Sequence, residues 1–598
     1  MRSTARPRIA VTLLIFAAGW LLSRESADSL QKVPLEPALI APYSSVITAA
    51  NGSMWVRNDG KSANSPTNRS GIRFPADVAG TVYQDGIVWG GNVLDGQSPD
   101  LRVGGQTHRI GTQPGNIVSS GVAATGPDSL YRVYRIRPDW QNLDPLTLLM
   151  EAATVNEIDT SQVTAQQIQE VSQQYQQDWD EWPVNLGAPF VDVNQNGSWD
   201  PGIDEPGIPN ADQTIWFVCN DLDTLRTKFL YGSRPVGLEM QTTVWSFDRP
   251  GVIADAVFKR YRLIYKGALP TTPATARIEN MYLSQWSDAD IGNYIDDVVG
   301  CDTTRDLAFA YNGTPSDTEF MNTPPAYGYQ LLQGPIMPSS GDTADFDFRR
   351  LLNFRNVRMS SFVYTALGSS IPQPNLGTYD GTIQWYKQLQ GLQANLNDTP
   401  YIAGSGPNSG QATVFPLSGD PETGTGDVDA LGNNLPSGDR IMALNAGPFN
   451  MALNDTQEVI IAALGNRGDD YLKSVTVLDS TADFLKTAYE SGFDILTGIS
   501  KPSQRLTTFK LSQNYPNPFN PETTISYELK QTSRVTLNVY NLLGQKVAAL
   551  VKQQQTAGRY TTRWNGKNAA GEQVASGLYL YRLSTELGAE TRKMMLLK

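Results

Sequence analysis

The sequence predicts a mainly β, multi-domain protein with a few helices, built as a sandwich-rich body followed by a smaller C-terminal sandwich. Short runs in which apolar and polar residues alternate recur along most of the chain, as expected for half-buried strands. The chain contains 52 glycines and 37 prolines, which supply the frequent turns that such strands need. At 598 residues it exceeds the size of a single hydrophobic core, so we expect several domains.

The first segment combines positive charge with an apolar run. Arg2, Arg6 and Arg8 precede residues 9–22, which are almost entirely apolar. This order is typical of a secretory signal peptide, and about fourteen residues are fewer than the roughly twenty that span a bilayer. We expect residues 1–29 to be a cleaved signal peptide. An uncleaved anchor is the alternative, because residues 23–27 make a poor cleavage site. We expect no membrane span in the mature chain.

Residues 30–150 come next and predict an N-terminal β-rich domain. They contain short strands separated by turns, many aromatic residues, and paired glycines at 90–91 and 104–105. Glycine inside a strand marks a place where another part of the chain approaches the backbone closely. We therefore expect tight packing at both glycine pairs.

Residues 151–500 predict a central β-rich region. Successive long strands follow a glutamine-rich helix near 162–182, and a second helix is expected near 470–491 from its apolar face. A polar linker over 501–508 then leads to the last domain, 509–598.

The clearest chemical motif in the body is a calcium-type loop over residues 192–204. It follows the pattern Asp-x-Asn-x-Asn-Gly, in which alternating oxygen side chains converge because Gly197 turns the chain sharply. Ile203 stands where a bidentate glutamate is usual, and nearby prolines disfavour flanking helices. We expect calcium in a loop set between strands or turns; a loop of Asx turns without metal is the alternative. The expected ligands are Asp192, Asn194, Asn196, Ser198 through its carbonyl, Asp200 and Asp204.

A second acidic cluster follows the long strands. Carboxylates so close in sequence repel one another unless they are spread into solvent or neutralised by a cation. A second calcium site is one interpretation and a solvated acidic surface is another; acid–base chemistry on a glycan is a third. The cluster consists of Asp288, Asp290, Asp296, Asp297 and Asp302.

The charge balance excludes some classes of partner. The chain has 47 Lys and Arg against 60 Asp and Glu, a formal net charge of -13. Nucleic acid and anionic membranes are therefore poor partners for it, and we expect neither.

Cysteine and histidine are rare. Cys219 and Cys301 could pair or lie buried as separate thiols, and they cannot form a disulfide framework. His108 is the only histidine, which excludes a zinc site built from several histidines. Its polar, hairpin-like surroundings favour a surface position.

The C-terminal segment, 509–598, predicts a small immunoglobulin-like domain. Prolines at 516, 518 and 521 prevent a helix at its start. Period-two strands separated by turn signals then follow, as a compact antiparallel sandwich requires. The apolar positions are Ile525, Tyr527 and Leu529, then Val535, Leu537 and Val539, then Tyr560 and Trp564, then Tyr579, Tyr581 and Leu583.

The same segment resembles the C-terminal sorting domain of type IX secretion substrates, and it is also similar to the immunoglobulin-like module of flagellar hook-capping proteins. The resemblance to the sorting domain implies the type IX machinery as partner and export across the outer membrane of a Gram-negative bacterium. The motifs that carry it are Tyr515-Pro-Asn-Pro-Phe-Asn-Pro-Glu-Thr-Thr-Ile525, Val539-Tyr-Asn-Leu-Leu-Gly-Gln545, Trp564-Asn-Gly566, Ala575-Ser-Gly-Leu-Tyr579 and Lys593-Met-Met-Leu-Leu-Lys598.

The body also resembles the central region of large secreted proteins that carry the same sorting domain. This likeness implies a recurring architecture and transfers no catalytic residue. It rests on Asp192-Val-Asn-Gln-Asn-Gly197, Gly237-Leu-Glu239, Trp286-Ser-Asp-Ala-Asp290, Gly300-Cys-Asp302, Pro324-Pro-Ala326, Gln333-Gly-Pro335 and Ser418-Gly-Asp-Pro421.

Together these patterns favour a secreted or cell-surface, non-enzymatic protein with a structural or adhesive role, stabilised by calcium. Its exposed loops or aromatic residues would contact a glycan or another protein. A secreted hydrolase acting on polysaccharide or peptide through paired carboxylates is the alternative. A surface protein that binds nutrients in an apolar pocket is a third hypothesis.

Overall fold

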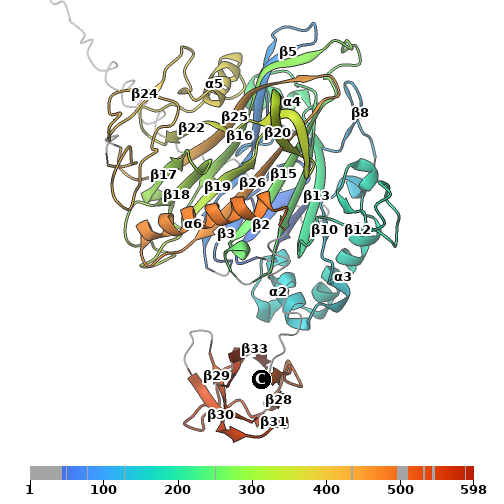
Figure 1. Ribbon diagram of the computed structural model, residues 1–598, viewed down its shortest axis with the longest axis vertical. Coiled ribbons are helices and arrows are strands. Elements are labelled where there is room, and N and C mark those ends of the chain that lie inside the picture. Colours follow the sequence, from blue (N-terminus) through green and yellow to red (C-terminus); the bar gives the residue numbers. More distant parts are fainter. Residues whose placement is uncertain are drawn as a thin grey trace, which may run out of the picture. The chain divides into compact units, whose positions relative to one another are not determined.

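The computed structural model describes residues 43–493, apart from 49, 77, 127, 250 and 432–434, and residues 509–597, apart from 530–531, 542–545 and 586–587. The chain forms two compact units, Met1–Ile499 and Ser500–Lys598, which we call the body and the C-terminal unit (Figure 1). The expected signal peptide and linker lie outside the described residues. Strands dominate both units, so the predicted mainly β fold class is confirmed.

The largest element of the body is an antiparallel nine-stranded sheet. Its order is β10-β13-β14-β15-β26-β19-β18-β17, with β7 beside β13. The strands are β7 (Gln113–Pro114), β10 (Tyr134–Ile136), β13 (Gln213–Asn220), β14 (Leu238–Ser246), β15 (Ala256–Tyr265), β17 (Asp297–Asp302), β18 (Leu307–Asn312), β19 (Ala326–Gln333) and β26 (Thr456–Asn466).

A five-stranded sheet, in the order β22-β25-β16-β5-β6, provides the second layer. Its strands are β5 (Gln84–Leu94), β6 (Leu101–Gly105), β16 (Arg277–Ala289), β22 (Met359–Ala366) and β25 (Arg440–Ala452). Because β5 and β6 complete a sheet with strands from the later chain, the prediction of a separate N-terminal domain over 30–150 is wrong. The expected close packing at the glycine pairs is present: a Cβ added to Gly104 would lie 2.5 Å from Nε1 of Trp89.

The main core lies between these two sheets. Apolar side chains from β5, β16 and β25 join those from β14, β15, β19 and β26 in one buried cluster. A polar contact crosses it as well: Nζ of Lys259 on β15 lies 2.8 Å from Oδ2 of Asp85 on β5, and both side chains are fully buried. The same Asp85 oxygen accepts a hydrogen bond of 2.8 Å from the hydroxyl of Tyr329 on β19.

A long helix covers the outer face of the nine-stranded sheet. Helix α6 (Tyr471–Glu490) lies across its strands in Figure 1 and buries Val475, Leu478 and Leu485 against them. Its N-cap Asp470 accepts hydrogen bonds from the backbone N–H groups of Leu472 and Lys473, which explains where it begins. The other α-helices among the described residues are α2 (Pro145–Asn156), α3 (Ala165–Asp180), α4 (Thr224–Tyr231) and α5 (Tyr379–Leu389), of which α4 and α5 contact β6 of the five-stranded sheet.

Smaller sheets contain the other described strands of the body. β1 (Ser44–Ile47), β2 (Ser53–Arg57), β3 (Ile72–Arg73) and β4 (Gly80–Val82) form a four-stranded sheet. The two-stranded pairs are β8 (Ile117–Ser119) with β9 (Val122–Ala123), β11 (Phe190–Val191) with β12 (Glu205–Pro206), β20 (Ile336–Phe346) with β21 (Arg349–Asn356), and β23 (Tyr401–Ile402) with β24 (Ala412–Thr413).

The C-terminal unit is a sandwich of a three-stranded sheet, β27-β28-β31, and a four-stranded sheet, β30-β29-β32-β33. Its strands are β27 (Phe509–Leu511), β28 (Thr523–Leu529), β29 (Ser533–Tyr540), β30 (Lys546–Gln555), β31 (Gly558–Trp564), β32 (Gly577–Thr585) and β33 (Gly588–Leu596). The predicted period-two positions point inward, and only Tyr560 among them is half-buried. These residues form a core of their own.

Two further findings concern the body. Cys219 on β13 and Cys301 on β17 are free, separately buried thiols, because their strands lie near opposite edges of the nine-stranded sheet. Within the described residues no helix is long and apolar enough to cross a membrane.

Candidate functional site

A pocket lies on the face of the five-stranded sheet that points away from the main core. The hydroxyl of Ser287 contacts that of Tyr329 on the nine-stranded sheet at 3.4 Å, so Ser287 faces inward. Because side chains alternate along a strand, its neighbours Trp286 and Asp288 face outward. The pocket has an empty volume of about 480 Å³, part of which is open solvent.

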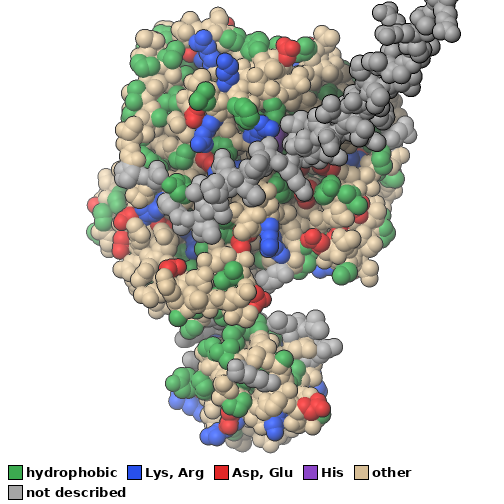
Figure 2. All heavy atoms as spheres, turned by 180° about the vertical axis from the view of Figure 1, so that it is seen from behind, with side chains coloured by type: hydrophobic (Ala, Val, Ile, Leu, Met, Phe, Trp, Pro, Cys, Tyr) green, Lys and Arg blue, Asp and Glu red, His purple; other side chains and the backbone are tan. Residues whose placement is uncertain are grey.

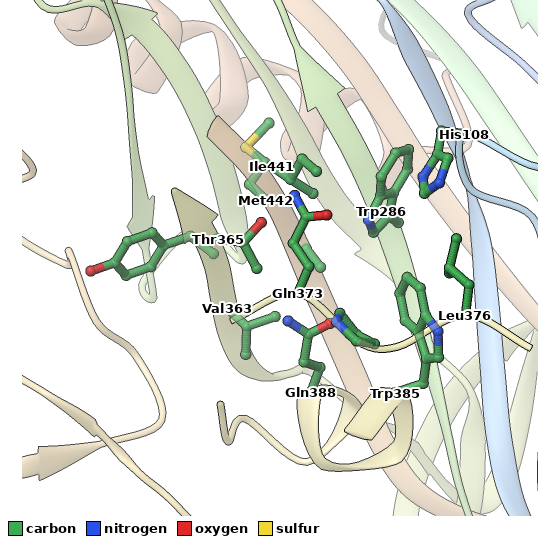
Figure 3. A pocket seen from close by; sticks show the side chains of 13 residues that line it. His108, Trp286, Val363, Thr365, Gln373, Leu376, Trp385, Gln388, Ile441 and Met442 are labelled. Carbon is green, nitrogen blue, oxygen red and sulfur yellow. The ribbon is translucent and has the colours of Figure 1, made fainter. Parts of the chain in front are cut away.

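Five regions of the chain build this pocket (Figure 3). β22, β16 and β25 supply its floor, α5 and the segment before it supply one wall, and the turn after β6 supplies His108. We call it the Trp286 pocket. It is lined by His108, Trp286, Val363, Tyr364, Thr365, Gln373, Pro374, Leu376, Trp385, Gln388, Ile441, Met442 and Ala443.

Aromatic rings form one side of the Trp286 pocket. The rings of His108 and Trp286 lie beside each other with centroids 5.9 Å apart, and Trp385 from α5 also lines the cavity (Figure 3). Trp385 is held by an edge-on contact with Tyr231, with centroids 5.4 Å apart. The rings therefore come from separate elements and are fixed by packing.

The rest of the lining offers polar groups without charge. The hydroxyl of Thr365 and the indole nitrogen of Trp385 are buried and have no hydrogen-bond partner among the described residues. Gln373 is exposed and Gln388 is buried at the wall. Buried polar atoms without partners are uncommon in folded proteins, so this lining is suited to a ligand that supplies hydrogen bonds.

His108 corrects the sequence interpretation of a surface histidine. It is half-buried beside Trp286, because the turn after β6 folds it onto the five-stranded sheet. Burial, with the charges of Arg109 and Lys61, lowers the pKa of His108 to about 4. The imidazole is therefore neutral at physiological pH.

Three carboxylates adjoin the Trp286 pocket. Asp288 stands two residues after Trp286 on β16 and is paired across the sheet with Ile441, a lining residue. Burial and the charge of Asp439 raise the pKa of Asp290 to about 7. Burial, together with Asp290 and Asp439, raises the pKa of Asp288 well above its ordinary value. We call Asp288, Asp290 and Asp439 the carboxylate triad. Sequence reasoning missed Asp439, because it is far away along the chain.

The other predicted members of the acidic cluster, Asp296, Asp297 and Asp302, have partners outside the carboxylate triad. Asp296 accepts hydrogen bonds from Asn312 and Thr314, at 3.0 and 2.7 Å. Asp302 caps the turn after β17 and forms an ion pair with Arg305; although burial opposes it, hydrogen bonds from Thr304 and Arg305 lower its pKa.

Asp297 begins β17 and is buried, with its Oδ2 accepting a hydrogen bond of 3.1 Å from the backbone of Ile291. Burial, and next the charge of Asp290, raises its pKa. Asp302 ends the same six-residue strand, roughly 16 Å away. The structure therefore does not bring all five predicted residues of this cluster to one point.

The calcium-type loop lies between β11 and β12, which pair and close its two ends. Asp192 accepts hydrogen bonds from the backbone N–H groups of Asn196 and Gly197, at 3.1 and 2.7 Å. Gly197 has a φ of 78°, which permits the sharp turn. Asp204 is buried and accepts from the backbone of both Val193 and Asp200, at 2.9 and 2.7 Å.

The side chains of this loop converge on Asp200. The amide nitrogens of Asn194 and Asn196 both donate to its Oδ2, at 2.8 and 2.6 Å. The amide oxygens of Asn194 and Asn196 accept hydrogen bonds from the backbone N–H groups of Asn196 and Ser198, at 3.2 and 2.7 Å. Ser198 lies exposed at the tip.

Among the described residues, no three His, Cys, Asp or Glu side chains are grouped so that they could hold a metal ion. The expected ligands of the loop at 192–204 are not such a group, because they include asparagine amides and a backbone carbonyl.

The comparisons with known proteins concern mainly the C-terminal unit. Residues 516–588 match the FlgD Ig-like domain family. This unit is therefore an Ig-like domain, as its strands predicted. No curated protein matches the chain.

Solved structures give weaker likenesses. FlgD from P. aeruginosa is 24% identical, with a TM-score of 0.11, and the match covers 15% of this chain and 64% of that one. A polysaccharide lyase is 6% identical over 61% of this chain and 35% of its own, with a TM-score of 0.16. PorZ of Porphyromonas gingivalis, a surface component of the type IX secretion system, is 10% identical over 67% and 46%, with a TM-score of 0.12. The chain thus spans less than two thirds of each of these proteins.

The last strand of the Ig-like domain has two distinct faces. Met594 and Leu596 are fully buried in its core, whereas Lys593 and Leu597 are exposed. The buried pair holds β33 in place, and Leu597 follows directly after this strand.

Proposed function

We propose that this chain is a secreted or cell-surface, non-enzymatic protein with a structural or adhesive role, exported from a Gram-negative bacterium by the type IX machinery. The observation that carries the proposal is the C-terminal unit, a complete Ig-like sandwich with its own core. Export machinery could recognise a module of this kind independently of the function of the body. Its sequence motifs, above all those at 515–525 and 593–598, are those that resemble the sorting domain.

The body would supply the adhesive surface. The Trp286 pocket offers aromatic rings and uncharged polar groups, which is the chemistry of ligand binding. On the face drawn in Figure 2, acidic and basic side chains are interspersed among the described residues, which fits a secreted protein better than one that binds nucleic acid.

Calcium would stabilise the loop at 192–204. Asp192, Asp200, Asn194 and Asn196 would supply oxygen ligands, with the carbonyl of Ser198, while Asp204 holds the two ends of the loop together. The ion would offset the repulsion between the carboxylates and hold an exposed loop rigid.

Export is tested in a bacterium that has the type IX system. The full chain should reach the cell surface or medium, whereas a chain that ends at residue 508 should stay in the periplasm. Lys593→Ala with Leu597→Ala separates recognition from folding, because both side chains are exposed. Thr561→Ala, on another strand of the same domain, is the matched control. Equal surface fractions for the full and shortened chains would overturn the proposal.

The carboxylate triad supports a second candidate, a hydrolase acting on polysaccharide or peptide. A carboxyl with a pKa near 7, as for Asp290, is suited to donating a proton at neutral pH, and it adjoins a pocket. This candidate expects cleavage of a polysaccharide or peptide panel, with Asp290→Asn lowering kcat by at least about a hundredfold. If the purified protein cleaves nothing in the panel, the non-enzymatic function stands.

A further inference from the structure

The lining of the Trp286 pocket restricts the charge of its ligand. None of its 13 lining residues is Asp, Glu, Lys or Arg, and its histidine is neutral at physiological pH. An anionic ligand would lose its hydration shell without gaining a partner of opposite charge, which is costly in a partly enclosed site, and it would lie beside the carboxylate triad. The lining therefore disfavours an anionic ligand.

The same lining disfavours a purely apolar ligand. Such a ligand would leave the hydroxyl of Thr365 and the indole nitrogen of Trp385 without hydrogen bonds, as they are now. In Figure 3 the amide of Gln373 lies between Trp286 and Thr365, so a third polar group faces the cavity. The ligand should carry several hydrogen-bonding groups.

One common class of molecule has both properties. A sugar ring presents an apolar face of C–H groups, which packs on an aromatic ring, and an edge of hydroxyl groups, which donate and accept hydrogen bonds. Trp286, Trp385 and His108 offer aromatic surface, and Thr365 with the glutamines offers polar partners. We infer that the Trp286 pocket binds a neutral sugar residue of a glycan.

The pocket opens to solvent, so the remainder of a glycan would stay outside while one residue contacts the lining. The inference rests on the proposed adhesive function and names the ligand class of its site. It implies that surface export and sugar binding use different units of the chain.

The test is a titration of the purified full-length protein, followed by tryptophan fluorescence, with glucose, galactose, mannose and N-acetylglucosamine. At least one should give a saturable change, with a Kd on the order of 1 mM for so small a ligand. Glucuronate is the charged comparison and should bind at least roughly tenfold more weakly. If none of the four neutral sugars gives a saturable change, or if glucuronate binds equally well, the inference is wrong.

Two variants locate the site. Thr365→Val removes a hydroxyl with little change of shape, and Gln373→Ala truncates an exposed side chain, so both should fold. Each should weaken binding roughly five- to tenfold. Thr242→Val is the matched control for the first, since its buried hydroxyl also has no partner among the described residues and lies on β14. Gln176→Ala, exposed on α3, is the control for the second.

The outcomes separate this inference from the proposed function. Binding that is equal in the pocket variants and their controls would place the sugar elsewhere and overturn the inference. Normal surface export of a chain that binds no sugar would remove the inference and leave the export proposal intact. Sugar binding by a chain that is never exported would overturn the export proposal and leave the inference intact.

Discussion

Lys259 and Asp85 are a buried ion pair between the two large sheets of the body, where charge is costly. The pair is tolerated because Ser62 and Tyr329 also bond to it, which satisfies most of its polar atoms. Lys259→Met would leave the carboxylate of Asp85 buried without its cation. We expect this change to lower the free energy of unfolding by about 3–5 kcal/mol, measured by urea denaturation.

The double variant Lys259→Met with Asp85→Leu separates charge from packing. It should recover much of the loss, because no unpaired charge remains. Lys473→Met, which breaks an exposed pair with Glu422, is the control and should leave stability nearly unchanged. A single variant as stable as the original chain would show that the buried pair is not needed.

Asp290 makes the stability of the body depend on pH. Its pKa is raised from 3.8 to about 7 by burial and by the charge of Asp439. A raised carboxyl pKa means that the folded state binds the proton more tightly, so the contribution is complete below about pH 4 and is lost as pH rises through about 7. The Tm in the presence of chelator should therefore fall between pH 5 and pH 8.

Asp290→Asn tests this assignment, because asparagine resembles the protonated acid at every pH. The fall in Tm between pH 5 and pH 8 should become smaller in the variant. Asp180→Asn, at the exposed end of α3, should leave the fall unchanged. The assignment is wrong if both variants keep the original pH dependence.

At the scale of single elements, the loop at 192–204 makes the clearest prediction. β11 and β12 fix its ends, and its side chains converge on Asp200, so one cation should suffice to order it. Calorimetric titration of the full chain with Ca²⁺ should show one site at this loop. Calcium at a hundred times its Kd would stabilise the folded loop by about 2.7 kcal/mol.

Asp200→Ala should abolish that calcium binding, because it removes the carboxylate that both asparagine amides contact. Asp302→Asn is the control, since Asp302 already pairs with Arg305 and stands on a different strand. If Asp200→Ala still binds calcium, the calcium site is not in this loop.

At the scale of the whole molecule, the two units should unfold separately. The buried cluster of the C-terminal unit contains residues of that unit alone. Calorimetry of the full chain should show a separate transition for it, with an enthalpy on the order of 60 kcal/mol for roughly 90 residues. Deletion of residues 509–598 should remove this transition and leave the Tm of the body unchanged. A single transition that is shifted by the deletion would show that the units are coupled.

The sequence by itself determined what depends on near neighbours. In the C-terminal unit, the alternation through Ile525, Tyr527 and Leu529 predicted the buried face of β28, because the side-chain period of a strand is local. The apolar face over 470–491 predicted α6, because the 3.6-residue period of a helix is also local. The loop around Gly197 was recognisable for the same reason. The boundary near residue 500 followed from composition and agrees with the two units.

Only the tertiary structure decided which distant segments meet. β16 pairs with β5 and β25, which are far from it along the chain, and this pairing abolished the expected N-terminal domain. It also placed His108, Thr365 and Trp385 around one cavity and brought Asp439 to Asp290. No local sequence pattern predicts these contacts, because they depend on how strands that are far apart in the sequence pack together. Helix α5 was missed by the sequence analysis, although its N-cap Thr378 is a local signal.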